Sequence, residues 1–335
     1  MSSKVFRWGL SSPASIAAEF TRAIRTSPSA EVVAVASRDL GRARAFADKH
    51  DVGSAFGSLE DLVASHEVDG VYVCSPVHAH AAALEVIAAA GKAVLIEKPF
   101  ATCAAEAEAM FATAKRHEVF LMEAMWTRFL PAWQQIRALV DAGRIGEIRG
   151  ASASLGFPIV GGARDNFLLD PAKGGGSLLE VGVYPAQFLQ GYLGTPTAVA
   201  AAVIESETGV DLSVAAALTF GDKVASMQSS MTQLLPCSAT ISGTFGIIHV
   251  PAVFHAARRF EIHTLDGDAA HPFSVELVDA EPSIDPLAYQ AIHVAERIAQ
   301  GEAESDIMSP GDTVAALRII DAIRESGRSR STSDS

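Results

Sequence analysis

A lysine stands where an apolar run of residues ends, a position in which a cation would be held rigidly inside a site. Residues 93–96 read AVLI, as expected for a strand buried on both faces, and Glu97, Lys98 and Pro99 follow directly. Proline lacks the N–H group that would continue a sheet ladder, so the strand should stop there. Two interpretations are open at this point. Either Glu97 forms a salt bridge at the strand end, or Lys98 presents its ammonium group to a reactive group.

The first turn after a predicted strand, WGLSSPASIA at residues 8–17, is a candidate phosphate-binding turn. Turns that bind a dinucleotide pyrophosphate usually read G-x-G-x-x-G, because glycine lets the backbone approach the phosphates at a helix N-terminus. Here Ser12, Ala14 and Ala17 occupy the fingerprint positions, and Gly9 comes too early. Small side chains keep the backbone accessible, and serine hydroxyl groups can donate to phosphate. The predicted cofactor contacts of this turn are Ser12, Ala14, Ser15 and Ile16.

The next predicted strand ends in ASRD, at residues 36–39, where dinucleotide-binding domains distinguish two cofactors. Enzymes that bind NAD place an acidic residue there, and it accepts hydrogen bonds from the ribose hydroxyl groups. Ser37 and Arg38 instead combine a hydroxyl with a guanidinium group, and this pair suits the 2′-phosphate of NADP. The sequence thus favours NADP, with NAD as the second possibility. In the alternative interpretation Arg38 is a solvated charge at the start of a helix.

The first part of the chain alternates short apolar runs with helical stretches. We predict strands at residues 5–10, 31–37, 70–75, 93–98 and 119–125. Strands that alternate with helices of about 10–15 residues are typical of βαβ units in a parallel sheet. Residues 1–126 are therefore expected to form an α/β, Rossmann-type, dinucleotide-binding domain.

The pattern changes after a predicted helix at residues 130–142. Short strands then follow one another, at residues 147–157, 198–206, 210–220, 223–231, 238–244 and 246–252. Successive strands without helices between them are typical of an antiparallel sheet. We expect residues 127–335 to form an α+β domain for substrate binding and oligomerisation, with a large, mostly antiparallel open sheet. The helices at 286–300 and 310–326 are expected to pack back on the first domain, and residues 327–335 to be a disordered tail.

Composition and charge exclude several classes of protein. The 335 residues are 49% apolar and 19% charged, as in ordinary globular proteins. A net charge of −13 without a basic stripe argues against a nucleic-acid partner. Cys74, Cys103 and Cys237 are scattered, which predicts no disulfide framework and no metal site and fits a reducing compartment. Without a secretory signal or an apolar run of about 18 residues, we expect a cytoplasmic protein with no membrane partner.

Taken together, the motifs resemble those of the Gfo/Idh/MocA family of NAD(P)-dependent oxidoreductases. The ordered set extends from residue 7 to residue 324 and comprises RWGLSSPASIA, VAVASRD, CSPVHAH, GKAVLIEKPF, EAMWTRFLPA, GGGSLLEVGVYP and ESDIMSPGDTVAALRIIDAI. The triplet EKP alone is weakly specific, whereas the ordered set is specific. Within the family, the chain looks most similar to the branch that contains dihydrodiol dehydrogenase and NADP-dependent D-xylose dehydrogenase.

The resemblance assigns a role to the lysine at the strand end. In this family the lysine of the EKP motif points into the nicotinamide pocket, and the proline peptide that follows it is typically cis. Lys98 and Pro99 match these positions, and Glu97 is expected beside the cofactor. An ammonium group next to an alcohol or phenol favours the deprotonated form of that group and stabilises alkoxide character during hydride transfer.

The resemblance implies a second catalytic position in the motif GGGSLLEVGVYP. Its matching residues, Glu180 and Tyr184, share one face of a helix at a spacing of i and i+4. Tyr184 matches the acid/base of the dihydrodiol branch, and a phenol with an ordinary pKa of about 10 needs a cation such as Lys98 beside it. Glu180 departs from the family's aspartate, and a displacement of ~1 Å can cost about 10²-fold in rate. The alternative is that Tyr184 packs in the core with one satisfied hydroxyl group.

Further contacts follow from the resemblance and from the strand ends, since ligands bind at the carboxyl edge of open α/β sheets. Trp126 is expected to line the substrate pocket, and Arg164 is either a substrate contact or a loop charge. The alternative for His80 is a packing or helix-capping role. The expected cofactor contacts beyond the first turn are Ser37, Arg38, Ser75, Pro76, His80, Glu97, Lys98 and Arg128, and the expected substrate contacts are Trp126, Lys98, Arg164, Glu180 and Tyr184.

These assignments lead to the hypothesis of an NADP-dependent oxidoreductase that acts on CH–OH groups of a sugar, polyol or cyclic diol. The family implies a homodimer or homotetramer assembled through the C-terminal sheet. A rival hypothesis, favoured by the unusual Ser12, Ala14 and Glu180, is a non-catalytic dinucleotide- or sugar-binding regulator on the same scaffold. The presence of Lys98 and Tyr184 favours the enzyme. A lyase that uses bound NAD transiently is permitted by the fold but has no motif to support it.

Overall fold

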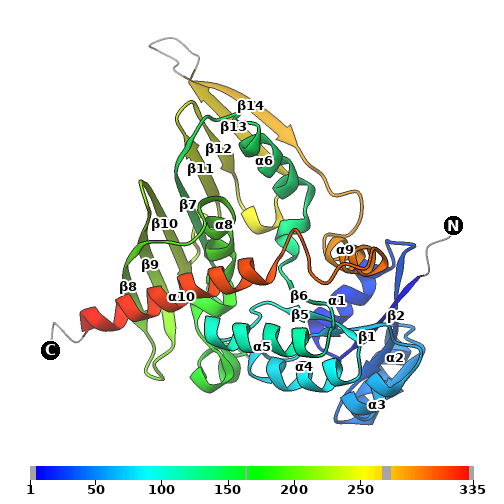
Figure 1. Cartoon of the computed structure of the whole chain (residues 1–335). Helices are drawn as coiled ribbons and strands as arrows, with labels where there is room; N and C mark the ends of the chain where they lie inside the picture. The colour runs from blue at the N-terminus through cyan, green and yellow to red at the C-terminus, as the bar shows by residue number, and fades with distance from the viewer. Residues whose placement is uncertain (1–4, 163, 266–272, 332–335) are drawn as a thin grey trace. The chain divides into compact units, whose positions relative to one another are not determined.

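The computed structural model describes residues 5–162, 164–265 and 273–331, and the chain divides into two compact units (Figure 1). The first unit comprises the residues up to Phe129 together with Ser283–Thr313. The second comprises Leu130–Pro282 and the residues from Val314 onward. A segment near the C-terminus thus belongs to the first unit, although most of the chain's second half forms the other one.

A six-stranded parallel sheet forms the centre of the first unit, as predicted for a Rossmann-type domain (Figure 1). Its strand order is β3-β2-β1-β4-β5-β6, and all neighbouring strands run parallel. The strands are β1 (Phe6–Leu10), β2 (Ala30–Ala36), β3 (Ser54–Phe56), β4 (Gly70–Val73), β5 (Ala93–Glu97) and β6 (Leu121–Ala124). The order reverses between β1 and β4, and ligands bind at the carboxyl edge of such a sheet, next to the reversal.

All five predicted strands of this sheet are present, whereas β3 was not predicted. With three residues, β3 is too short to show a period of two. Every residue of β4 and β5 is buried, which explains the continuous apolar runs of these two strands. The helices of this unit are α1 (Ser15–Ile24), α2 (Leu40–Lys49), α3 (Leu59–Ala64), α4 (His80–Ala89), α5 (Ala104–Arg116) and α9 (Ala288–Ala299), with the 3₁₀ segments η1 (Val77–Ala79) and η2 (Trp126–Phe129).

An aromatic cluster fixes α1 on the parallel sheet. Phe20 of α1 stacks on Tyr72 of β4 with their ring centroids 4.1 Å apart, and it meets Trp8 of β1 edge-on at 5.9 Å. All three side chains are fully buried. Aromatic pairs of this kind contribute about 0.5–1.5 kcal/mol beyond the burial of their area. The turn between β1 and α1 is therefore held in a defined place at the carboxyl edge of the sheet.

An eight-stranded sheet forms the centre of the second unit, in the order β14-β13-β12-β11-β7-β10-β9-β8. Its neighbouring strands are antiparallel except for β7 and β10, which run parallel, so the prediction of a large, mostly antiparallel sheet is confirmed. The strands are β7 (Ile148–Gly156), β8 (Ala198–Glu205), β9 (Asp211–Phe220), β10 (Lys223–Ser230), β11 (Ala239–Gly243), β12 (Gly246–Val250), β13 (Arg259–Leu265) and β14 (Phe273–Asp279). β13 and β14 were not predicted.

The two faces of this sheet differ in burial. Ile241, Ile248 and Ile262 are buried on one face, whereas Ile204 and Val224 are 65% and 67% exposed on the other. Helix α8 (Val183–Leu193) packs against β7, β10 and β11. The other helical elements assigned to this unit are α6 (Pro131–Asp141), α7 (Asp165–Leu168), the 3₁₀ segments η3 (Pro171–Lys173) and η5 (Phe254–Ala256), and the π-helical segment η4 (Leu178–Gly182).

The C-terminal helices do not group as one pair. Helix α9 belongs to the first unit, whereas α10 (Pro310–Ser331) starts there and belongs to the second unit from Val314 onward. Residues 327–331, which the sequence placed in a disordered tail, continue α10, and residues 332–335 lie outside the described residues. Across the described ranges, no helix combines the length and the apolar character needed to cross a membrane.

Candidate active site

The turn between β1 and α1 carries the features of an anion-binding helix start. Helix α1 begins at Ser15, its N-cap residue Ala14 makes no side-chain capping hydrogen bond, and its first turn contains no acidic residue. Backbone N–H groups at such a terminus need acceptors, and the helix dipole favours a negative charge there. Ser15 is exposed and Ala14 and Ile16 are partly buried. The residues of this turn therefore fit a pyrophosphate through backbone groups.

We predicted that a serine hydroxyl group before the helix contacts the cofactor, but the serine hydroxyl groups there form hydrogen bonds within the protein. The Ser12 hydroxyl donates to the Cys74 carbonyl at 3.2 Å, and the Cys74 N–H donates to the Ser11 hydroxyl at 3.0 Å. The donor that we assigned to a phosphate at Ser12 is thus used to tie the turn to the end of β4. Gly9 is explained by packing, because a Cβ atom there would lie 2.8 Å from a methyl carbon of Leu62.

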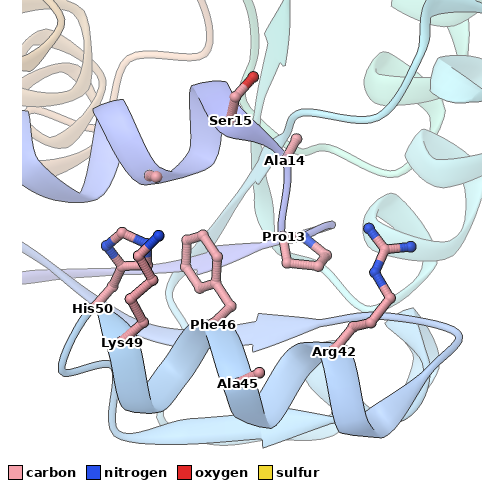
Figure 2. Close-up of a pocket in the computed structure, with 9 residues that line it drawn as sticks. Pro13, Ala14, Ser15, Arg42, Ala45, Phe46, Lys49 and His50 are labelled. Atoms are coloured by element: carbon pink, nitrogen blue, oxygen red, sulfur yellow. The ribbon is translucent and has the colours of Figure 1, made fainter. Parts of the chain in front are cut away.

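A cavity of about 360 Å³ opens between the start of α1 and helix α2 (Figure 2). Figure 2 shows the side chains of Arg42, Phe46 and Lys49 of α2, and of His50 directly after it, on the side of α2 that faces α1 and Pro13. Arg42 and Lys49 are positively charged, which suits an anionic ligand, whereas burial lowers the pKa of His50. This group of side chains was not predicted from the sequence. Arg42 lies in the first turn of α2, but its place beside Ala14 depends on tertiary packing between distant segments.

The ASRD segment joins the end of β2 to the N-cap of α2. The Asp39 carboxylate accepts hydrogen bonds from the N–H groups of Gly41 and Arg42 at 2.8 and 3.2 Å, and thereby caps the helix. The Ser37 hydroxyl accepts the Asp39 N–H at 3.2 Å. Arg38 is exposed, so its guanidinium group is open to a ligand or to solvent.

The end of β4 offers a further polar group at the carboxyl edge. The hydroxyl oxygen of Ser75 is buried and has no hydrogen-bond partner within the described part of the chain. A buried hydroxyl without a partner costs roughly 1–3 kcal/mol, and a ligand that bonds to it recovers this cost. Pro76, which follows, is exposed. Both residues therefore suit the predicted contact with a bound dinucleotide.

Lys98 follows β5 in a turn that buried side chains hold in place. The Lys98 N–H donates to Glu97 Oε2 at 3.1 Å, and the Tyr72 hydroxyl donates to Glu97 Oε1. Glu97 is 8% exposed, and burial raises the pKa of its carboxyl group. The Lys98–Pro99 peptide is cis, as the resemblance implies. Both oxygens of Glu97 are thus engaged within the protein, so its position supports Lys98 rather than a direct contact with the cofactor.

Two further buried side chains lie around the same turn. His80 is 1% exposed, with Nδ1 3.0 Å from the Phe100 carbonyl and Nε2 2.8 Å from the Ser75 carbonyl. This matches the packing alternative for His80, and burial lowers the pKa of the ring. Glu123 of β6 accepts a hydrogen bond from the Thr313 hydroxyl at 2.9 Å, and burial raises the pKa of its carboxyl group to about 7.

Arg128 has contacts that the sequence did not predict. It is 4% exposed, its Nη1 lies 3.3 Å from Asp312 Oδ1, and it donates to the Ile307 carbonyl at 3.4 Å. These contacts attach residues 307–312 to the segment after β6. Trp126, two residues earlier in η2, is partly exposed, as a pocket-lining residue would be.

In the second unit, a buried aspartate fixes the segment that carries the other predicted catalytic residues. Asp211 accepts hydrogen bonds from the Leu178 N–H at 2.6 Å and from the Ser177 hydroxyl at 2.8 Å. Gly176 has φ = 118°, and a Cβ atom there would lie 2.4 Å from an oxygen of Asp211. Glycine is therefore required for the chain to approach this carboxylate. Burial raises the pKa of Asp211.

Glu180 and Tyr184 belong to different helical segments. We predicted one regular helix, but Glu180 lies in the π-helical η4 and Tyr184 lies at the start of α8. Arg164 forms an ion pair with Glu180, with Nη2 2.7 Å from Oε1. The buried ring of Tyr184 contacts His255 with 4.6 Å between centroids. No motif in the sequence pointed to His255, which lies in the 3₁₀ segment η5.

Among the described residues, no group of three or more His, Cys, Asp or Glu side chains could hold a metal ion. The chemistry available is that of a lysine on the carboxyl edge of a dinucleotide-type sheet in one unit, and of a tyrosine and a glutamate in the other. This combination is typical of oxidoreductases that use a nicotinamide dinucleotide.

Comparison with known proteins supports this class. The model of an oxidoreductase family with an NAD-binding Rossmann fold matches residues 13–125, and the GFO/IDH/MocA C-terminal domain matches residues 133–249. The first unit is therefore an NAD-binding Rossmann domain, and the protein is an oxidoreductase. The chain belongs to the Gfo/Idh/MocA family, which confirms the resemblance seen in its motifs.

Relatives cover nearly the whole chain. Trans-1,2-dihydrobenzene-1,2-diol dehydrogenase from Homo sapiens is 35% identical over 327 residues, which cover 95% of this chain and 96% of that protein. The enzyme of the same name from Xenopus tropicalis is 33% identical over 320 residues, with 94% and 96% covered. The crystal structure of a 3-ketoreductase from Actinomadura kijaniata, in complex with NADP and TDP-benzene, has a TM-score of 0.82 at 27% identity and covers 96% of this chain and 98% of that chain.

Because the carboxyl group of Glu123 is buried, the free energy of unfolding should depend on pH. The folded protein holds its proton up to a pH of about 7, whereas an exposed glutamate releases it near 4.5. Between these values the folded state binds more protons than the unfolded state, so stability should fall as the pH rises, by up to about 3 kcal/mol. Glutamine does not titrate, so Glu123→Gln should remove this slope. Urea unfolding of both proteins from about pH 5 to about pH 8 measures it.

Glu108→Gln is the matched control, because Glu108 lies exposed on α5. It should leave the pH dependence of the wild type unchanged. If Glu123→Gln and the wild type show parallel profiles, the raised pKa of Glu123 is wrong.

Proposed function

We propose that this protein is an NADP-dependent oxidoreductase that transfers hydride between nicotinamide and a hydroxyl or carbonyl carbon of a sugar, polyol or cyclic diol. The observation that carries the proposal is the position of Lys98, which buried Glu97 holds at the carboxyl edge of the Rossmann sheet. The named relatives support the substrate class, since they are a diol dehydrogenase and a 3-ketoreductase. Because the 3-ketoreductase is in complex with NADP, it supports the cofactor as well.

The cofactor preference rests on positive charge near the first two helices. Backbone groups at Ala14 and Ser15 would hold the pyrophosphate, and the Ser75 hydroxyl would bond to a polar group of the dinucleotide. Arg38 and Arg42 would hold the 2′-phosphate, for which guanidinium groups are well suited. Arg38 is exposed just before α2, and Arg42 of α2 lines the cavity beside the phosphate-binding turn, so both are accessible to a ligand.

The proposed reaction transfers a hydride and a proton, and different groups carry the two. When bound, the nicotinamide supplies or accepts the hydride. Tyr184 accepts the hydroxyl proton in the oxidative direction and returns it in the reductive direction. The Lys98 ammonium group stabilises negative charge on the substrate oxygen. Glu180 orients a neighbouring hydroxyl group of the substrate.

A non-catalytic dinucleotide- or sugar-binding regulator is the second candidate. One observation favours it, because the Ser12 hydroxyl is turned toward Cys74 and the turn lacks the usual glycines. A regulator would bind the cofactor or a sugar without turnover, whereas the enzyme would bind its cofactor and also turn over a substrate. Measurement of turnover therefore separates the two candidates.

Titration of the purified protein with NADPH and NADH tests the cofactor assignment. Nicotinamide fluorescence should report tighter binding of NADPH, and NADPH at 100 times its Kd should add about 2.7 kcal/mol to the free energy of unfolding. Arg38→Gln and Arg42→Gln should each weaken NADPH binding about 10- to 100-fold, because each removes a charge-assisted hydrogen bond, and should leave NADH binding unchanged. Arg44→Gln, at another exposed position of α2, is the control. Equal affinity for both cofactors in the wild type contradicts the assignment.

Substitution of the two proposed catalytic side chains tests the chemistry. Tyr184→Phe removes the proton carrier and should lower kcat by about 10²- to 10⁴-fold, and Lys98→Met should lower it by a similar factor. The Kd of NADPH should change little for Tyr184→Phe. Steady-state kinetics with a panel of aldoses and cyclic diols measures kcat. Tyr192→Phe, on the same helix, should retain wild-type turnover, and full activity of Tyr184→Phe would refute the role of Tyr184.

A second copy of the chain is proposed to cover the exposed face of the eight-stranded sheet. Strand register places Ile204, Val224, Leu265, Val275 and Leu277 on one face, and each is more than half exposed. Exposed apolar surface of this extent is typical of an interface. The proposed assembly is a homodimer or a homotetramer, and the free cysteines support a location in the cytoplasm.

Light scattering coupled to size exclusion tests this assembly. The wild type should elute as a dimer or tetramer, and Val224→Glu combined with Leu277→Glu should elute as a monomer, because two buried charges in each copy oppose association. Leu234→Glu, which adds a charge at an exposed residue between β10 and β11, should leave the assembly intact. A monomeric wild type would rule out the proposed interface.

A further inference from the structure

The ion pair between Arg164 and Glu180 joins a loop to the proposed substrate site. Arg164 Nη2 lies 2.7 Å from Glu180 Oε1, a distance typical of a charge-assisted hydrogen bond. The Glu180 side chain is 17% exposed and the Arg164 side chain is 58% exposed. A fully exposed pair contributes about 0–1 kcal/mol to stability, so stability alone gives little reason for this contact. Its glutamate lies four residues before Tyr184, next to the proposed proton carrier in the sequence.

Hydrogen bonds join the described residues that flank Arg164. The Asp165 carboxylate accepts the N–H groups of Gly161 and Gly162 at 3.0 and 3.2 Å. Helix α7 follows at once, and its Leu168 carbonyl accepts the Gly176 N–H at 3.0 Å. Arg164 is therefore presented from a defined backbone, and that backbone is bonded to the glycine run that precedes Glu180.

The close approach of this segment to its neighbours requires glycine at two positions. A Cβ atom at Gly175 would lie 2.4 Å from the Leu168 carbonyl oxygen, and one at Gly176 would lie 2.4 Å from Asp211. The chain thus passes tightly between α7 and Asp211 before it enters η4. Both ends of the Arg164–Glu180 contact consequently start from backbone that has little room to move.

A glutamate side chain has three rotatable bonds, and fixing them costs up to about 2 kcal/mol of conformational entropy. A carboxylate that must receive a substrate hydroxyl group benefits from being fixed before the substrate binds. The guanidinium group of Arg164 supplies this restraint to one oxygen of Glu180.

We propose that Arg164 is a positioning residue that holds the Glu180 carboxylate in the orientation in which it receives a substrate hydroxyl group. The proposal rests on the proposed function, in which Glu180 orients the substrate. Arg164 acts through Glu180 and takes no part in the transfer of hydride or proton. The planar guanidinium group orients its N–H donors more rigidly than a lysine ammonium group does, so lysine at this position should restore only part of the effect.

A double-mutant cycle tests this role. Arg164→Gln should lower kcat by about 10- to 100-fold while the Kd of NADPH stays unchanged. Glu180→Asp withdraws the carboxylate from Arg164 and should lower kcat by a similar factor. In the double variant the losses should not multiply, because both substitutions remove the same contact. Arg164→Lys should recover part of kcat.

Arg258→Gln is the matched control, because Arg258 is 61% exposed and forms an ion pair of 2.9 Å with Glu281 in the same unit. It should leave kcat unchanged. Losses that multiply in the double variant, or an unchanged kcat in Arg164→Gln, would overturn the positioning role while leaving the proposed function in place. A wild type without turnover would overturn the proposed function and this inference with it.

Discussion

The hydrogen bond from the Lys98 backbone to the buried carboxyl group of Glu97 is the interaction on which the site in the first unit depends. The other oxygen of Glu97 accepts the Tyr72 hydroxyl, and the Tyr72 ring stacks on Phe20 of α1. One continuous set of contacts therefore joins the lysine after β5 to the helix that begins at the phosphate-binding turn. Because Glu97, Tyr72 and Phe20 are buried, the lysine backbone and the turn cannot shift without disturbing these contacts.

In the second unit, too, a buried carboxyl group accepts a backbone hydrogen bond near proposed catalytic residues. Asp211 is buried and accepts the backbone N–H of Leu178, where the segment with Glu180 and Tyr184 begins. In both units a carboxyl group taken out of water fixes the backbone just before a proposed catalytic residue. Burial raises the pKa of both carboxyl groups, which is the cost of this arrangement. In return, the backbone is held rigidly where each segment with proposed catalytic residues begins.

The parallel sheet, the antiparallel sheet and the family could be predicted from the sequence, because apolar runs and ordered motifs report them directly. Lys98 and Tyr184 could also be proposed as catalytic residues from the sequence, since both belong to such motifs. Arg42 and His255 were missed because they meet the site through tertiary packing between distant segments. The direction of the Ser12 hydroxyl was missed because it depends on the carbonyl at the end of β4, and the π-helical turn before Tyr184 leaves no mark on residue spacing.

Transfer of deuterium is the most direct measurement of the central claim that this protein moves hydride between NADPH and a carbon atom of its substrate. NADPH carrying deuterium at both hydrogen positions of nicotinamide C4 is incubated with the protein and a panel of carbonyl sugars and cyclic ketones, and the products are analysed by mass spectrometry. The account predicts stoichiometric consumption of NADPH and one deuterium on the new CH–OH carbon. Product without deuterium, or an altered substrate without net consumption of NADPH, would contradict it and favour a lyase. Binding without any product would favour a regulator.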